Sequence, residues 1–318
     1  MANISMKHLR YFDALARLGH FGRAAELCAI SQPALSMQIR ELETLIGAPL
    51  VERGTRQIRL TSLGEEFAAR SGAILRSVDD LADLARAAQG PLVGRLRIGV
   101  IPTVAPYLLP RVITSLTQAY PGLDLRPREA VTKTLIEDLH EARLDTAIVA
   151  LPISEPGLEE VELFDEEFVL VRGPGEANKP VPDPGMLHEM RLLLLEEGHC
   201  FRDQALSYCK LSPSVTRDLM EGSSLSTLVQ MVGAGIGITL IPEMALPIET
   251  RSAQVSLARL PAPAPTRTIG MVWRKSTPLG EQLARIAEIV RRVGSAATES
   301  AAQLPASAAS GNGDAPRL

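Results

Sequence analysis

The spacing of apolar residues changes near Gly90, and this change limits the folds open to the chain. Before Gly90 the apolar residues follow helical spacing, interrupted by one hairpin pattern. After Gly90, short apolar runs such as "RLRIGVI" and "LDTAIVAL" alternate with amphipathic helical patterns. Alternating strands and helices are typical of a parallel α/β sheet covered by helices. We therefore predict a helical N-terminal region followed by an α/β region.

The α/β region contains two successive sets of strand and helix patterns. Two sets predict two lobes, and in such folds small ligands bind in a crevice at the carboxyl ends of the strands. A late strand over 266–274 and a helix over 279–293 follow, and the Ala/Ser/Gly-rich tail beyond them predicts disorder. The strands expected in the second set are "EFVLVRG", "RLLLLEE", "VTRDLME" and "IGITLIP".

The N-terminal region has the pattern of a helix-turn-helix. Helices are predicted over 7–18 and 21–30, and "SQPALSMQIRELETLIG" predicts a third helix that begins at the Ser31 cap and ends at Gly47. In this third helix Gln32, Ser36 and Arg40 recur every four residues and form a polar stripe. Such a stripe suits the reading of base edges in a DNA major groove. A merely solvated polar face is the alternative interpretation.

A basic hairpin and a long helix follow the predicted reading helix. "LVERGTRQIRLTS" predicts the hairpin, with Arg53 and Arg56 placed at its tip to contact the DNA backbone. Bases outnumber acids up to Thr61, although the whole chain carries a net charge of −4; this favours nucleic acid as a partner of the N-terminal end. A capping box at Ser62 predicts a helix to about Ala88, whose apolar residues lie seven apart and suit pairing with another subunit.

These patterns divide the chain into four parts. We predict a winged helix-turn-helix DNA-binding domain over 1–61 and a linker and dimerisation helix over 62–90. A two-lobed regulatory domain should occupy 91–294, and a disordered tail 295–318.

Composition excludes several classes of protein. No apolar stretch is long enough to span a bilayer, and the start of the chain lacks a secretory signal, so we expect a cytoplasmic protein with no membrane partner. The three cysteines and five histidines lack the spacing of a zinc site, so neither a metal nor another cofactor is expected.

The segment "EEGHCFRDQALSYC" holds two of the three cysteines, Cys200 and Cys209. One interpretation is that both thiols simply pack in a core. The other is a redox pair, because disulfides in a reducing compartment are transient or sensory. Cys200 is predicted to begin a helix, whose N–H groups and dipole favour negative charge on the sulfur. Since the thiolate is the nucleophile towards peroxide, these surroundings favour the redox interpretation.

The order of these parts resembles the LysR-type transcriptional regulators. "AAELCAISQPALSMQIRELETLIGAPLVER" carries the resemblance, while "IGVIPTVAPYLLP", "LLLLEEGHCFRDQALSYC" and "RTIGMVWR" are similar to peroxide-sensing members. The resemblance implies a winged helix-turn-helix, a linker helix and a two-lobed α/β effector domain of periplasmic-binding-protein type. It also implies a non-enzymatic activator, dimeric or tetrameric, that binds double-stranded promoter DNA and contacts RNA polymerase.

The same resemblance implies roles for individual residues. Cys200 is similar to the peroxidatic cysteine and Cys209 to the resolving cysteine, so hydrogen peroxide would be sensed by a reversible disulfide that controls antioxidant genes. A regulator that responds to a small metabolite and a thiol peroxidase are the alternatives. His199 could also be structural, and Asp203 an ordinary acid of a helix N-terminus. The residues that resemble the family's peroxide pocket are Thr103, Thr132, His199, Asp203 and Arg267.

Overall fold

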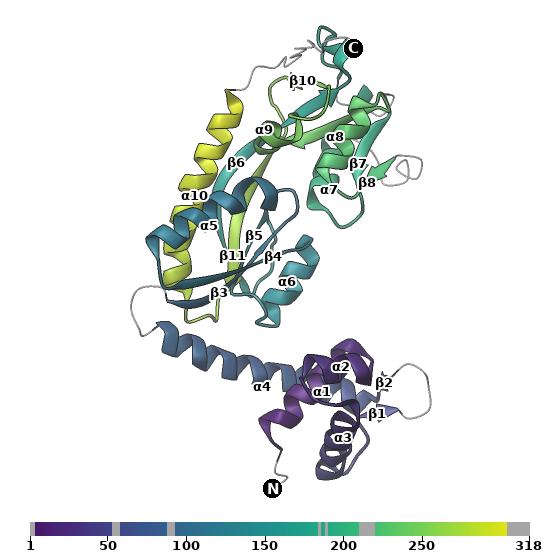
Figure 1. The fold of residues 1–318 in the computed structure, drawn as a ribbon, viewed down its shortest axis with the longest axis vertical. Coiled ribbons are helices and arrows are strands. Elements are labelled where there is room, and N and C mark those ends of the chain that lie inside the picture. The colour runs from purple at the N-terminus through teal and green to yellow at the C-terminus, as the bar shows by residue number, and fades with distance from the viewer. Residues whose placement is uncertain are drawn as a thin grey trace, which may run out of the picture. The chain divides into compact units, whose positions relative to one another are not determined.

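The computed structural model describes residues 4–52, 58–87, 93–183, 186–187, 190–209 and 220–303. The chain separates into two compact units, Met1–Ala85 and Arg86–Leu318 (Figure 1). In the part of the chain described, none of the helices has the length and apolar character needed to cross a membrane.

The first unit begins with the three predicted helices: α1 (Met6–Leu18), α2 (Phe21–Leu27) and α3 (Gln32–Ile46). The second ends at Leu27 and not at residue 30, because Ala29 has a left-handed backbone with a φ of 53°. The Ser31 hydroxyl accepts a hydrogen bond from the Ala34 N–H at 3.3 Å, and Gly47 ends α3 with a φ of 80°. The three helices enclose a core that includes Phe12 and Leu35. This core fixes α3 and leaves its polar side in solvent.

A two-stranded hairpin and a long helix complete this unit. β1 (Val51–Glu52) and β2 (Arg59–Leu60) pair antiparallel, as the hairpin prediction requires. The tip, with Arg53 and Arg56, lies outside the described residues. α4 (Ser62–Ala87) follows; its cap is Thr61, whose hydroxyl accepts from the Gly64 N–H at 3.0 Å, and not the predicted Ser62. Four large apolar side chains of α4 are exposed: Leu63, Ile74, Leu81 and Leu84.

The second unit has two lobes built on one twisted sheet of nine described strands. In the first lobe β3 lies between β4 and β5, all parallel, and β11 adds antiparallel to β5. Helices α5 and α6 follow β3 and β4 and cover the sheet (Figure 1). The elements of this lobe are β3 (Gly94–Val100), α5 (Ala105–Ala119), β4 (Leu123–Glu129), α6 (Thr132–His140), β5 (Thr146–Leu151) and β11 (Thr266–Arg274).

A single long strand, β6 (Leu158–Arg172), runs through both lobes. Its first part pairs with β11 up to Glu167, and from Phe168 onward it pairs with β9 and β10 of the second lobe. β7 is parallel to β9, and β8 forms the edge beside β7. The other elements here are β7 (Leu192–Leu195), α7 (Cys200–Tyr208), β8 (Glu221–Gly222), α8 (Leu225–Gly233), β9 (Ile238–Pro242), α9 (Leu246–Glu249) and β10 (Ser256–Arg259).

The sheet departs from the prediction in its direction and extent. It is mixed and not purely parallel, because β6 and β11 return antiparallel to their neighbours. The first half of β6 and all of β10 were not predicted. In β6 the acids of "LEEVELFD" break up the apolar run expected of a buried strand. Of the strand predicted over 215–221, only Met220 and Glu221 fall within the described residues, and Glu221 starts β8.

The last helix is longer than predicted. α10 extends over Gly280–Ala302, so the prediction that disorder begins at residue 295 is wrong for 295–302. Alanine is a strong helix former, and Ala297 and Ala301 are buried. The Arg259 guanidinium also donates a 2.8 Å hydrogen bond to the Ala302 carbonyl, which closes the end of the helix.

Candidate functional site

Cys200 is the first residue of α7, which confirms the predicted helix start. β7 ends at Leu195, and the chain then turns through Gly198, whose φ of 98° favours glycine. Among the described residues no side chain caps the first turn of α7. The first N–H groups and the helix dipole therefore favour negative charge at the half-buried Cys200 sulfur.

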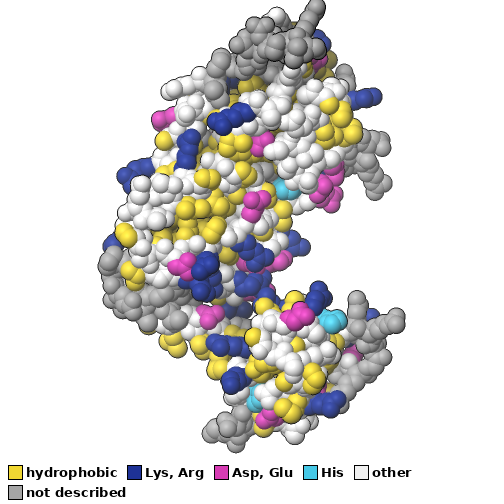
Figure 2. Space-filling model, in the orientation of Figure 1, with side chains coloured by type: hydrophobic (Ala, Val, Ile, Leu, Met, Phe, Trp, Pro, Cys, Tyr) yellow, Lys and Arg dark blue, Asp and Glu magenta, His cyan; other side chains and the backbone are white. Residues whose placement is uncertain are grey.

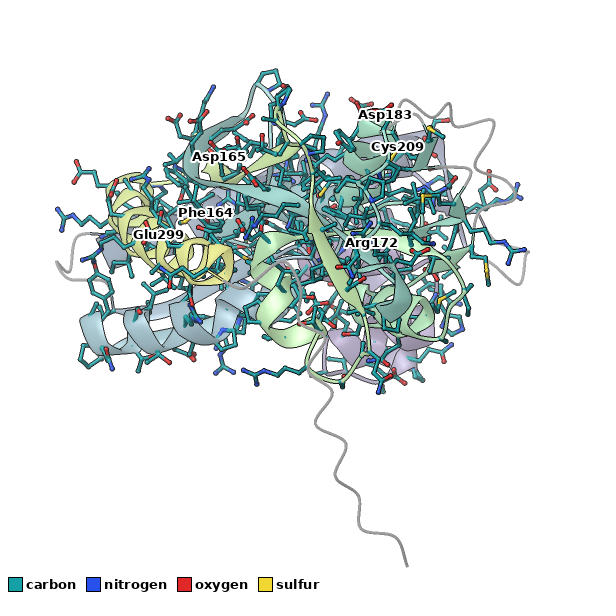
Figure 3. All side chains as sticks on the ribbon, turned by 90° about the horizontal axis from the view of Figure 1, so that it is seen from above. Phe164, Asp165, Arg172, Asp183, Cys209 and Glu299 are labelled. Atoms are coloured by element: carbon teal, nitrogen blue, oxygen red, sulfur yellow. The ribbon has the colours of Figure 1, made fainter. Side chains whose placement is uncertain are left out.

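Cys209 has the opposite surroundings at the other end of α7 (Figure 3). It is 1% exposed, and burial raises the pKa of its thiol to about 11. At neutral pH this group is therefore a thiol, and a weak nucleophile. The surroundings of Cys200 thus favour a nucleophilic sulfur, whereas those of Cys209 keep its sulfur protonated and away from solvent in this form.

The helix keeps these two cysteines apart. Both are free thiols, and the α-helical rise of about 1.5 Å per residue separates their Cα atoms by roughly 13 Å along the axis. A disulfide requires Cα atoms within about 7 Å. A bond between them therefore requires that α7 unwinds.

Arg267 on β11 interacts with residues of both lobes. Its Nη1 donates to the Thr103 Oγ1 at 2.8 Å and its Nη2 to the Thr103 carbonyl at 3.1 Å. Its Nε and Nη2 also donate to the Glu166 carboxylate at 2.8 and 2.6 Å, and both side chains of this ion pair are 0% exposed. The guanidinium lies 5.2 Å from the ring centroid of Phe201, the residue after Cys200. Phe201, in the first turn of α7, thus interacts with a guanidinium that residues of the other lobe hold in place.

Thr132 occupies the equivalent position after the next strand, at the start of α6. Its Oγ1 is buried and has no hydrogen-bond partner in the described structure. Its neighbour Val131 lies 3.9 Å from the position that a Cβ on Gly198 would take, which places Thr132 close to the turn before Cys200. Buried hydroxyls are normally hydrogen-bonded, so an unpartnered one suits a small polar ligand.

His199 and Asp203 flank Cys200 in different ways. Burial lowers the pKa of His199, while the carboxylates of Glu196 and Glu129 act in the opposite direction. Glu129 ends β4, so both lobes influence this imidazole. Asp203 is exposed in the first turn of α7, and within the described chain no hydrogen bond or ion pair joins it to the other predicted pocket residues. The structure thus brings Thr103 and Arg267 into contact and leaves Asp203 outside that network.

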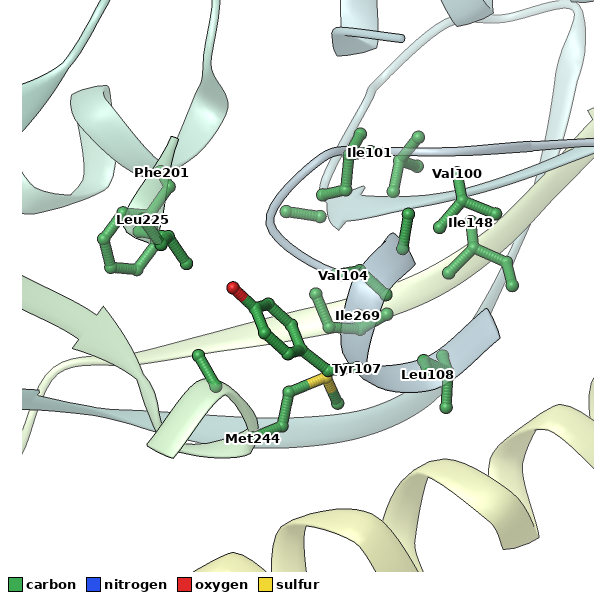
Figure 4. Close-up of a cluster of buried hydrophobic side chains, with 14 of the residues drawn as sticks. Val100, Ile101, Val104, Tyr107, Leu108, Ile148, Phe201, Leu225, Met244 and Ile269 are labelled. Carbon is green, nitrogen blue, oxygen red and sulfur yellow. The ribbon is translucent and has the colours of Figure 1, made fainter. Parts of the chain in front are cut away.

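Sequence reasoning missed a buried network near Arg267. The Tyr107 hydroxyl on α5 donates to Glu249 of α9 at 2.7 Å, and Ser226 of α8 donates to the other oxygen of that carboxylate at 2.5 Å. Burial, helped by Glu249, raises the pKa of Tyr107. In Figure 4 the Tyr107 hydroxyl points towards Phe201 and Leu225 of the second lobe. These partners lie far apart in sequence, and no local pattern marks them.

The polar stripe of α3 lies where a DNA-reading surface would need it. Gln32 and Arg40 are exposed and Ser36 is partly exposed, whereas Leu35 and Ile39 between them are buried. On the face of the molecule shown in Figure 2, acidic and basic side chains are interspersed. What the structure shows for Gln32, Ser36 and Arg40 is that they share one side of α3, away from its buried face.

Two family models match the chain. Residues 6–65 match the bacterial regulatory helix-turn-helix protein of the lysR family, and residues 89–295 match the LysR substrate binding domain. The chain is a LysR-family transcriptional regulator. Proteins of this family are DNA-binding regulators and not enzymes, so a thiol peroxidase is excluded.

Within its family this LysR regulator is similar to OxyR proteins. A probable hydrogen peroxide-inducible genes activator of Streptomyces viridosporus is 42% identical over 293 residues, 90% of this chain and 93% of that relative. The DNA-binding transcriptional dual regulator OxyR of Escherichia coli strain K12 is 39% identical over 291 residues, 91% and 95% of the two chains. A hydrogen peroxide-bound mutant OxyR of Corynebacterium glutamicum has a TM-score of 0.64 and 35% identity, covering 94% and 95%.

Proposed function

We propose that this LysR-family regulator senses hydrogen peroxide through a reversible Cys200–Cys209 disulfide and thereby controls transcription of antioxidant genes. The observation that carries this proposal is the contrast between the two cysteines: one half-exposed at an uncapped helix start, the other sealed, with its pKa raised to about 11. Promoter DNA and RNA polymerase are its partners, and α4, with its exposed apolar side chains, joins subunits into a dimer or a dimer of dimers.

The chemistry proceeds in two steps. The Cys200 thiolate attacks one oxygen of hydrogen peroxide, the O–O bond breaks, and hydroxide leaves and is protonated to water, so that Cys200 becomes a sulfenic acid. The Cys209 sulfur then attacks the Cys200 sulfur, the S–O bond breaks, and a second water leaves as the disulfide forms. A thiol reductant of the cell returns both cysteines to thiols.

The pocket residues bind peroxide and the helix converts oxidation into a change of shape. Thr103, Thr132 and His199 provide polar atoms around the Cys200 sulfur, and Arg267 holds the first turn through Phe201. Because the disulfide requires that α7 unwinds, Phe201, Leu206 and Tyr208 must find new packing after oxidation. That repacking alters the subunit arrangement and hence the spacing of the α3 helices on DNA.

A peroxide pulse followed by thiol mass spectrometry and DNA footprinting of the same samples tests this proposal. We expect wild type to form the Cys200–Cys209 disulfide and to change its footprint more than its affinity. Cys209→Ser should stop at the Cys200 sulfenic acid and keep the footprint of the reduced form. If Cys200 stayed reduced while the protein bound its promoter normally, a regulator of a small metabolite would be the better assignment.

Replacing Thr132 by valine should separate stability from function. Valine keeps the shape of threonine and removes a hydroxyl that is buried without a partner. Leaving a buried polar group unpaired costs about 1–3 kcal/mol, so the free energy of unfolding should stay level or rise. The rate constant for Cys200 oxidation by peroxide should nevertheless fall. A variant that oxidises as fast as wild type would remove Thr132 from the pocket.

Substitutions on the two predicted DNA elements should have different consequences. Gln32→Ala or Ser36→Ala should reduce discrimination between operator and mismatched DNA by roughly 1–3 kcal/mol, because base contacts specify the sequence. Arg53→Ala or Arg56→Ala should weaken binding to all sequences alike and flatten its salt dependence. Binding isotherms at several salt concentrations distinguish the two. Equal effects of both kinds of substitution on all sequences would refute the reading role of the α3 stripe.

A further inference from the structure

Arg202, two residues after Cys200, is a buried cation that interacts with two other segments of the chain. Only 5% of the residue is exposed. Its Nη1 donates to the Leu195 carbonyl at 2.7 Å and lies 2.6 Å from the Glu221 Oε1, with which it forms an ion pair. The Glu221 side chain is 36% exposed, so the buried charge of Arg202 meets its counter-charge at the edge of the lobe.

The two partners of Arg202 lie on opposite sides of the cysteine pair in sequence. Leu195 ends β7, before Cys200, and Glu221 begins β8, beyond Cys209. β8 is the edge strand of the sheet next to β7. In this pair Leu194 lies opposite Glu221. One side chain of α7 therefore ties the helix between the cysteines to both strands that flank the segment.

We propose that the Arg202–Glu221 ion pair is a latch that holds α7 helical and so opposes closure of the Cys200–Cys209 disulfide. This inference rests on the proposed function. Because the disulfide requires that Phe201–Tyr208 unwinds, Arg202 has to leave the Leu195 carbonyl when the bond closes. The ion pair is thus present in the reduced form and lost in the oxidised form. Its strength therefore sets how oxidising the cell must become before the Cys200–Cys209 disulfide forms.

The burial of Arg202 decides whether loss of the Glu221 charge favours or opposes the disulfide. Removing the Glu221 charge leaves the Arg202 guanidinium buried without a counter-ion in the reduced helix, which is unfavourable. In the unwound form the guanidinium can be hydrated instead, so the loss of Glu221 matters less there. Weakening the pair should therefore make the disulfide more stable, which is a gain of oxidation and not a loss.

Glu221→Gln in the full-length protein tests the latch, because glutamine keeps the shape and removes the charge. The variants are equilibrated in dithiothreitol redox buffers, and the disulfide fraction is read by mass spectrometry after alkylation. We expect the equilibrium constant for disulfide formation to rise about tenfold, which lowers the reduction potential by about 30 mV. Glu221→Asp, which keeps the charge on a shorter side chain, should give a smaller shift.

The matched control is Glu243→Gln. Glu243 forms a 2.6 Å ion pair with Arg259 in the same unit, its side chain is 8% exposed, and no hydrogen bond or ion pair of the described residues joins it to α7. The control should keep the wild-type equilibrium. If wild type forms the disulfide and Glu221→Gln matches wild type, or shifts no more than Glu243→Gln, the latch is refuted. A wild-type protein that never forms the disulfide would instead refute the proposed function.

Discussion

Replacing Cys200 by serine should slow thiol oxidation by hydrogen peroxide by at least about a thousandfold at pH 7. The thiol left in the segment is Cys209, whose pKa of about 11 leaves roughly one molecule in ten thousand as thiolate at that pH. Its 1% exposure also keeps peroxide away from the sulfur. The measurement is the loss of free thiols with time at several peroxide concentrations, which yields the second-order rate constant.

Cys28→Ser is the control for this variant. Cys28 lies at the end of α2 in the other unit, and burial, with a smaller effect from Asp13, raises the pKa of its thiol. Its removal should leave the rate constant of the wild type unchanged. When Cys200 and Cys28 are both replaced by serine, the slow reaction that remains should increase about tenfold per pH unit up to about pH 11, because it follows the Cys209 thiolate. Rapid oxidation of Cys200→Ser at pH 7 would contradict the assignment of the attacking cysteine.

The second large effect concerns stability. Arg267→Met should reduce the free energy of unfolding of the regulatory unit by about 3–5 kcal/mol, because it leaves the Glu166 charge buried and unpaired. Burial already raises the pKa of Glu166, and in the wild type the Arg267 guanidinium opposes that shift. The variant also loses both hydrogen bonds to Thr103.

Urea unfolding followed by tryptophan fluorescence measures this loss. Trp273 is the one tryptophan of the chain and is buried on β11, so the signal reports on this unit. Arg126→Met is the control: Arg126 and its partner Asp124 are 61% and 46% exposed, and exposed ion pairs contribute about 0–1 kcal/mol. If both variants lost the same free energy of unfolding, the buried Arg267–Glu166 pair would contribute no more to stability than an exposed ion pair.

The elements around Cys200 could be predicted because their signals are local. The helix start at Cys200 follows from the residues around it, and the α3 stripe follows from a four-residue spacing. Thr103 and Arg267 were expected through resemblance to a family, and the structure joins them by a hydrogen bond. The sequence order of strands also predicted correctly that β3, β4 and β5 are parallel.

The remaining features depend on contacts between distant parts of the chain. The antiparallel course of β6 is decided by its neighbours β11 and β9, which come much later in sequence. The partners Glu166 and Glu249 look like ordinary acids until the fold buries them against Arg267 and Tyr107. The last turns of α10 look like low-complexity sequence, and they are helical because Ala297 and Ala301 are packed and Arg259 holds the end.

The uninterrupted strand β6 has a mechanical consequence for signalling. Hinged two-lobed receptors close like a clamshell about flexible connections, but here the two lobes share one hydrogen-bonded strand, whose pairing passes from β11 to β9 at Glu167 and Phe168 without a gap. Rotating one lobe against the other would bend that strand and break the ladder on either side of it. Unwinding the short helix α7 while the two lobes stay in place costs less free energy than rotating them. In the proposed function, oxidation would then change α7 and its packing while the two lobes keep their arrangement about β6.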